Sequence, residues 1–165
     1  MIRAPQAPPE VLAVLHKERG DGAREQALRV GAHQVFTATL TDVLERRVLA
    51  AAQATSWRDV AGTSAAEVAP REGEYVLTSI NEGPFATATH DALDRARQLE
   101  GDYELRVLTI PSLYLFALWL HGENDVVIPM DPAPTGLNAN EPYNEVRLTE
   151  ALRPLAERRS TEPLV

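Results

Sequence analysis

The chain has 165 residues, of which 44% are hydrophobic and 24% charged, a composition typical of a soluble globular protein rather than a disordered one. Its formal net charge of −8 disfavours a nucleic-acid partner, because an acidic surface repels phosphate backbones. It has no cysteine, which excludes disulfides, thiolate nucleophiles and cysteine-ligated metals.

The N-terminus and the longest apolar run indicate where the protein resides. Residues 1–5 lack the apolar stretch of a signal peptide, and the run at 113–120 is far shorter than the roughly 20 residues that cross a bilayer. We therefore expect a cytoplasmic protein without a membrane partner. Lys17 is the only lysine among the 16 Lys and Arg residues, which we interpret as the base composition of a bacterial genome.

The first elements in chain order are an arm and a helix. Residues 1–9 contain three prolines, which cannot continue a helix or a central strand, so we predict a flexible Pro-rich arm. Pro8 or Pro9 then begins a helix with apolar residues on one side, and Gly20 and Gly22 end it.

Period-two alternation of apolar residues predicts a strand over residues 28–40, in which Gly31 marks a bulge or bend. Thr41 then offers a side-chain N-cap, and apolar residues recur at three- and four-residue spacing. This pattern predicts a helix over residues 42–54.

Shorter elements follow. Residues 57–60 and 75–80 are strand-like, and the small polar residues between Gly62 and Gly73 predict a surface loop with at most one helical turn. The sequence Asn-Glu-Gly-Pro at 81–84 predicts a turn, after which residues 85–88 pair back and Thr89 caps a helix that extends to Gly101.

The densest apolar segment, residues 103–130, identifies the core. Its apolar residues occupy both parities, which indicates strands that are covered on both faces. Pro111 divides the segment, so we favour strands at 104–110, 113–121 and 126–128, with a tight turn at 122–125. The alternative is a buried helix over 113–121, capped by Ser112.

The C-terminal part is predicted to contain a long irregular loop and a helix. Residues 129–142 carry four prolines, and loops of this length are often functional. A helix over 144–159 directs Leu148, Ala151, Leu152 and Leu155 inward, with Pro154 inside it. Together the elements predict a single α+β domain with a mostly antiparallel sheet and about four packed helices.

Two groups of polar residues are the candidate binding residues. His121, Glu123 and Asp125 end the apolar run and could hold a cation or exchange protons, although Gly122 and Asn124 favour a solvated turn instead. The proline-bearing loop gathers further hydrogen-bonding groups: Asp131, Asn138, Asn140, Glu141 and Tyr143. His90 and Asp91 are better explained by a helix N-terminus, and Trp119 by the core.

The sequence contains no strong catalytic motif. Gly20 and Gly22 follow a helix rather than a strand, so they do not match a dinucleotide fingerprint, and neither a phosphate-binding glycine loop nor a nucleophile elbow is present. We predict no catalytic residues, no metal and no cofactor. The leading hypothesis is a non-catalytic protein-interaction module, an accessory subunit with a protein partner or a homo-oligomer. The alternative is a small-molecule enzyme or ligand-binding domain that uses the two polar groups.

Overall fold

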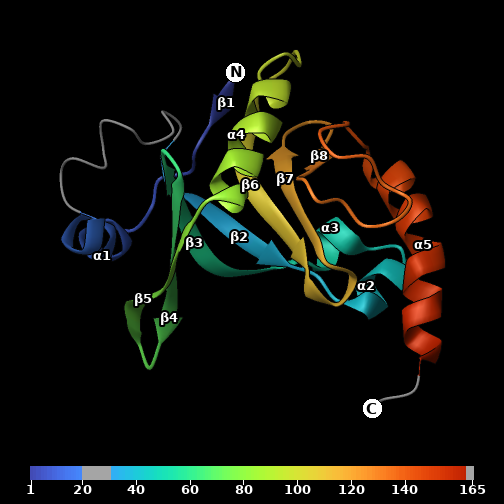
Figure 1. The fold of residues 1–165 in the computed structure, drawn as a ribbon, viewed down its shortest axis with the longest axis horizontal. Helices are drawn as coiled ribbons and strands as arrows, with labels where there is room; N and C mark the ends of the chain where they lie inside the picture. Colours follow the sequence, from blue (N-terminus) through green and yellow to red (C-terminus); the bar gives the residue numbers. More distant parts are fainter. Residues whose placement is uncertain (20–30, 163–165) are drawn as a thin grey trace.

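The computed structural model describes residues 1–19 and 31–162 and contains a mixed sheet with helices on both faces (Figure 1). The strands are paired in the order β5-β4-β3-β2-β6-β7-β8, with β1 also beside β6. The strands are β1 (Ile2–Arg3), β2 (His33–Thr37), β3 (Gln53–Ala61), β4 (Ser64–Arg71), β5 (Glu74–Glu82), β6 (Tyr103–Ile110), β7 (Leu115–His121) and β8 (Val126–Pro129). The helices are α1 (Pro9–Arg19), α2 (Leu40–Leu44), α3 (Val48–Ala51), α4 (Pro84–Ala96) and α5 (Glu145–Thr161).

Most neighbouring strands are antiparallel, whereas β1 and β2 run parallel to β6. The predicted mixture of α and β structure with a mostly antiparallel sheet is therefore confirmed, and the described sheet is larger than expected. The strand predicted over residues 28–40 is confirmed as β2 at 33–37 and lies between β3 and β6, while residues 28–30 of that range lie outside the described residues. The outer edge of β5 pairs with no strand among the described residues.

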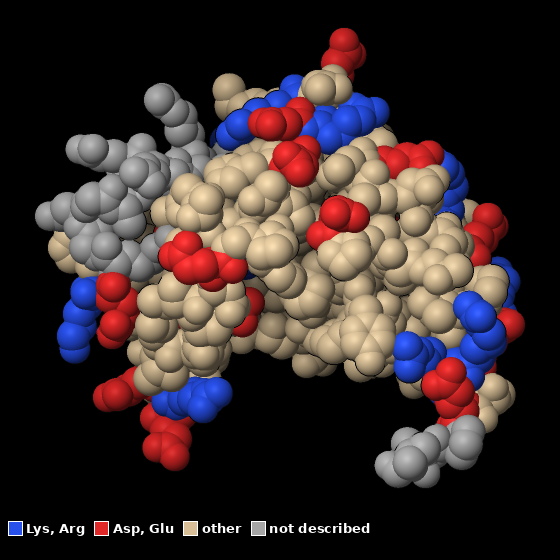
Figure 2. Space-filling view, in the orientation of Figure 1, with Lys and Arg blue, Asp and Glu red and all other residues tan. Residues whose placement is uncertain are grey.

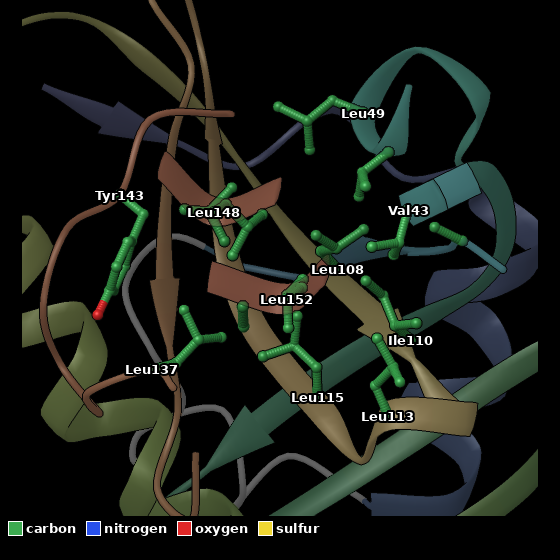
Figure 3. Packing of buried hydrophobic residues seen from close by; sticks show 14 of the residues in the cluster. Val43, Leu49, Leu108, Ile110, Leu113, Leu115, Leu137, Tyr143, Leu148 and Leu152 are labelled. Atoms are coloured by element: carbon green, nitrogen blue, oxygen red, sulfur yellow. The ribbon is translucent and has the colours of Figure 1, made fainter. Parts of the chain in front are cut away.

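The two faces of the sheet build separate cores. Helix α4 lies in front of the sheet in Figure 1 and buries Leu93 against Val35, Val107 and Leu118. The opposite face carries α2, α3 and α5, whose Val43, Leu49, Leu148 and Leu152 pack on Leu108 and Ile110 (Figure 3).

Helix α1 covers the β3–β5 part of the sheet. Its Val11 and Leu15 bury Trp57 and Ala66, which alternate along their strands with Val60 and Ala65 of the α4 core. Because successive strand residues point to opposite faces, α1 lies on the face opposite α4.

The apolar segment forms β6, β7 and β8, as predicted, and the buried-helix alternative for residues 113–121 is wrong. Pro111 does not break the core, because Pro111–Leu113 form a single 3₁₀ turn that connects β6 to β7. Residues 115 and 117–120 are buried, as expected for a strand covered on both faces. Trp119 is a core residue.

The predicted loose arm is instead attached to the sheet. Ile2 and Arg3 pair with Tyr103 and Glu104, the Tyr103 amide donates to the Met1 carbonyl at 2.9 Å, and Ala7 is buried under α1. Proline is compatible with this path because β1 ends before Pro5. Helix α1 begins at Pro9 as predicted; the expected stop signals at Gly20 and Gly22 lie outside the described residues.

The helix predicted over residues 42–54 is two short helices followed by a strand. Thr39, not Thr41, is the N-cap, and it forms a capping box in which the Asp42 amide donates to Thr39 Oγ1 at 3.2 Å. Arg46 then adopts a left-handed conformation with φ of 58°, which ends the first helix before α3. The three- and four-residue spacing is real, but local backbone geometry interrupts it.

The surface loop predicted between Gly62 and Gly73 is wrong, because most of these residues form β4. Alanine occurs on both faces of β4, so apolar and polar residues do not alternate visibly in its sequence. Ala66 and Val68 face α1, while Ala65 faces α4. Glu72 and Gly73 both have positive φ (51° and 82°), the geometry of a tight two-residue hairpin turn, and connect β4 to β5.

Residues 85–88 belong to α4 and do not pair back. The helix begins at Pro84, whose fixed φ suits a first helical turn, so Thr89, His90 and Asp91 lie inside the helix and not at its N-cap. The loop after β8 and helix α5 agree with the prediction, and Leu148 and Leu152 are buried. Across residues 1–19 and 31–162, no helix is both long and apolar enough to span a membrane.

Candidate functional site

The predicted group at His121, Glu123 and Asp125 forms the tip of the β7–β8 hairpin. His121 Nδ1 lies 3.0 Å from Asp125 Oδ1, which also accepts a hydrogen bond from the Gly122 amide at 3.0 Å. Glu123 is exposed beside them. These contacts are those of a closed polar turn, and within the described residues no cluster of His, Asp and Glu is arranged to hold a metal ion.

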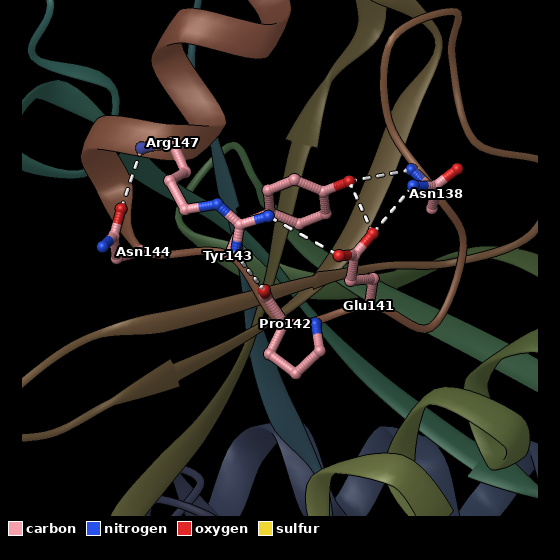
Figure 4. Close-up of polar contacts among 6 residues, drawn as sticks. All are labelled: Asn138, Glu141, Pro142, Tyr143, Asn144 and Arg147. Carbon is pink, nitrogen blue, oxygen red and sulfur yellow. Dashed lines mark hydrogen bonds and ion pairs between the residues drawn. The ribbon is translucent and has the colours of Figure 1, made fainter.

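The predicted loop residues are largely paired with one another (Figure 4). Glu141 Oε2 accepts hydrogen bonds from Asn138 Nδ2 at 2.8 Å and Tyr143 Oη at 3.1 Å, and Arg147 stacks on the Tyr143 ring at 4.8 Å. The Asn138 hydrogen bond, then those of Tyr143 and Arg147, lower the pKa of Glu141. This network fixes the loop against α5.

Two further loop residues lie outside the network. Asp131 is exposed and precedes a cis peptide bond to Pro132, and Asn140 is held by a 2.8 Å hydrogen bond from its amide to the Pro129 carbonyl. Among the described residues, no side-chain hydrogen bond or ion pair connects this loop to His121 or Asp125. The structure therefore does not join the two predicted groups through direct contacts.

A different row of polar residues crosses the sheet under α4. His33 on β2, Arg58 on β3, Glu67 on β4 and Ser79 on β5 are successive cross-strand partners. They lie on the α4 face because His33 has the parity of Val35, Arg58 that of Val60 and Glu67 that of Ala65. Buried polar side chains at apolar parity require partners or a function.

Arg58 is the central residue of this row and is only 4% exposed. Its Nη2 donates to Thr89 Oγ1 of α4 at 3.0 Å, and its guanidinium lies 5.0 Å from the centre of the Phe85 ring. Its Nη1 is buried and has no hydrogen-bond partner among the described residues. Burial lowers the pKa of Arg58 to about 10, partly offset by Glu67, so the guanidinium remains charged at neutral pH.

His33 lies next to Arg58 and is fully buried. Its Nδ1 donates to the Gly31 carbonyl at 3.3 Å, and its Nε2 has no partner within the part of the chain that the structure describes. Burial, and then the Arg58 charge, lower the pKa of His33 to about 4. The imidazole is therefore neutral at pH 7 and adds no second positive charge beside Arg58.

Arg58 lines a cavity of about 170 Å³, here called the Arg58 pocket, whose other side chains include Glu67, Ser79, Asn81, Phe85 and Phe116. The two phenylalanines meet edge to face, with ring centres 4.6 Å apart. Burial raises the pKa of Glu67, while Arg58 opposes that rise. No hydrogen bond or ion pair joins Glu67 to Arg58 among the described contacts, although the two are direct cross-strand partners.

Charged side chains are unevenly spread over the α4 face. Figure 2 shows acidic side chains over the middle of this face as well as at its rim, basic side chains mostly at the rim, and almost no charge in the area between the β4–β5 hairpin and the β6–β7 turn. The lining of the Arg58 pocket suits recognition of a small ligand that has an apolar part and a negative group.

A larger hollow of about 620 Å³ lies beside α2 and α3, lined by Thr37, Thr39, Asp42 and Thr55 among others. Its polar groups already bond one another: Thr37 Oγ1 lies 3.0 Å from Thr55 Oγ1, and Asp42 completes the capping box. It offers less unsatisfied binding capacity than the Arg58 pocket.

The Arg58 pocket was not predicted from the sequence. Arg58 lies in a predicted strand at the parity of the apolar Val60, a signal that such a charge is buried. Glu67 was assigned to a loop, and Ser79 lies across a pairing that depends on a bulge between Glu67 and Val68. The four residues of the polar row can be placed side by side only when the strand pairing of β4 is known.

Comparison with known proteins adds no relative: no protein-family model, curated protein or solved structure matches this chain.

Proposed function

We propose that this protein is a ligand-binding domain whose Arg58 pocket receives a small molecule carrying a carboxylate. The observation that supports this proposal is Arg58, a buried residue that lines the pocket and whose Nη1 has no hydrogen-bond partner among the described residues. An unsatisfied buried charged donor costs several kcal/mol more than a paired one, and a carboxylate accepts from a guanidinium in a planar, two-point geometry.

The rest of the pocket supports a ligand that is only partly polar. Phe85 and Phe116 supply an apolar wall, and Ser79 and Asn81 supply neutral hydrogen-bonding groups. Thr89 and Phe85 hold the guanidinium in place before any ligand arrives, which lowers the entropic cost of binding. A cavity of about 170 Å³ fits a small molecule rather than a polymer.

Titration with acetate, butanoate and 4-methylpentanoate tests the proposal. We expect backbone amide NMR shifts at residues 58, 67, 79, 81, 85 and 116, with affinity rising as the apolar tail lengthens. Arg58→Met keeps most of the side-chain volume but removes the charge, and should weaken binding at least about tenfold, the loss of one charge-assisted interaction.

Arg106→Met is the matched control. Arg106 is also partly buried and stacks on aromatic rings, 4.6 Å from Phe36 and 4.7 Å from Trp119, but it belongs to the opposite face of the sheet. We expect this variant to bind carboxylates like the wild type. Absence of any carboxylate-dependent shift in the wild-type protein, or equal loss in both variants, would refute the proposed function.

The protein-interaction module that the sequence favoured stays a prediction. It does not compete with the Arg58 pocket, because a ligand site and a protein surface can occupy different parts of one domain.

A further inference from the structure

We infer that the ligand of the Arg58 pocket is a zwitterion, a small apolar amino acid whose carboxylate meets Arg58 and whose ammonium meets Glu67. This inference rests on the proposed function and specifies its ligand class. It is carried by two opposite charges that line one pocket as direct cross-strand partners without pairing with each other.

The positions of the two residues on adjacent strands suit an α-amino acid. Cross-strand partners in an antiparallel pair have Cα atoms roughly 5 Å apart, so both side chains rise from adjacent points of the same face. An α-amino acid carries its carboxylate and ammonium on one carbon. One small ligand therefore reaches both groups while its side chain extends away from them.

A carboxylate without an ammonium would complement only one of the two charges. It would satisfy Arg58 Nη1 but would place a second negative charge beside Glu67, which is a direct neighbour of Arg58 in the row. An amine alone would satisfy Glu67 and oppose Arg58. A zwitterion complements both charges and brings no net charge into a partly buried site, which limits the desolvation cost.

The apolar wall indicates the side chain. Phe85 and Phe116 border the pocket from α4 and β7, whereas the two charged residues belong to β3 and β4. A branched aliphatic or compact aromatic side chain would pack against their rings, whereas a charged side chain would lose hydration without gaining a partner. Small apolar amino acids therefore fit better than acidic or basic ones.

Leucine and its two truncated forms provide matched probes. 4-Methylpentanoate is leucine without its ammonium, and 3-methylbutan-1-amine is leucine without its carboxylate. Calorimetric titration of the wild-type protein should show leucine binding about tenfold or more tightly than either truncated form, the size of one charge-assisted interaction.

Glu67→Gln separates the contribution of the ammonium. This variant should bind leucine and 4-methylpentanoate with equal affinity, because only the ammonium contact is lost. If Glu67→Gln fails to fold, as thermal unfolding would reveal, the wild-type comparison of the three probes still decides the inference.

The possible outcomes distinguish the inference from the proposed function. If 4-methylpentanoate binds the wild type as tightly as leucine, the zwitterion is wrong while the carboxylate site stands. If neither binds, or if the amine binds as tightly as leucine, the proposed function fails and the inference fails with it.

Discussion

His33 shows at the level of one residue how burial controls charge in this fold. It shares the row with Arg58 and Glu67, and its Nε2 has no partner in residues 1–19 and 31–162. A second cation beside Arg58 would repel it, so the folded state requires the neutral imidazole. The protein thereby links its stability to pH.

Acidification should destabilise the protein through His33. Its pKa is about 4 when folded and about 6.5 when unfolded, so the unfolded state binds more protons between those values. The contribution is fully present above about pH 6.5 and is lost as the pH falls to 4, a loss of about 3 kcal/mol. Denaturant unfolding at intervals from pH 7 to 4 measures it.

His33→Gln is the control for this pH dependence, because glutamine keeps a polar group and cannot titrate. Glu67 acts in the opposite sense, since its raised pKa favours the folded state at low pH, and it contributes equally in both proteins. The difference between the two pH profiles therefore isolates His33. Parallel profiles would contradict the assignment.

For single residues, the sequence indicates which side chains are buried but not which residues they contact. The parity of His33 with Val35, and of Arg58 with Val60, already places polar groups on an apolar face. Their juxtaposition depends on strand register, which period-two patterns do not specify. The candidate residues at His121 and in the 131–143 loop were easier to see because they cluster in the sequence, not because they share a pocket.

At the scale of elements, the start of α2 distinguishes two similar threonines. Thr39 Oγ1 accepts from the Asp42 amide at 3.2 Å, and Asp42 Oδ2 accepts from the Thr39 amide at 2.9 Å, whereas Thr41 is exposed. The cap must therefore depend on Thr39. Sequence alone favoured Thr41, because it precedes the apolar-periodic residues directly.

Thr39→Ala should lower the free energy of unfolding by about 1 kcal/mol, the usual cost of an N-cap deletion, and Thr41→Ala should change it by less than about 0.5 kcal/mol. Urea denaturation of both variants beside the wild type measures the difference. A larger loss for Thr41→Ala would restore the cap that the sequence predicted.

Elements were predictable where their signals were local and strong. Long apolar runs identified β6, β7 and β8, and proline marked the start of α1 and the loop after β8. The β4 strand was missed because alanine gives little contrast between its faces, and the break after α2 was missed because Arg46 adopts a positive φ without being glycine. Strand pairing determines β4, and the backbone conformation of Arg46 determines the break after α2.

At the scale of the whole molecule, the sheet separates two cores. Ile110 belongs to the core under α5 and Ile128 to the core under α4, and both are fully buried. Side chains on opposite faces share few neighbours. Their energetic contributions should therefore be independent.

Ile110→Val and Ile128→Val should each cost about 0.5–1.5 kcal/mol, and the double variant should lose their sum to within about 0.5 kcal/mol. Valine leaves enough stability for the double variant to fold. Chemical denaturation of the three variants measures the sum; a coupling well above this value would show that the sheet transmits strain between its faces.

The outer edge of β5, which pairs with no strand among residues 1–19 and 31–162, bears on how two copies of the protein would meet. If two β5 strands paired antiparallel about Thr78, Glu74 of each would lie opposite Glu82 of the other, so both ends of the shared ladder would carry repelling carboxylates. Exposed strand edges are where fibrils start, and like charges at their ends discourage such growth. The acidic ends of β5 would therefore oppose edge-to-edge pairing of two copies.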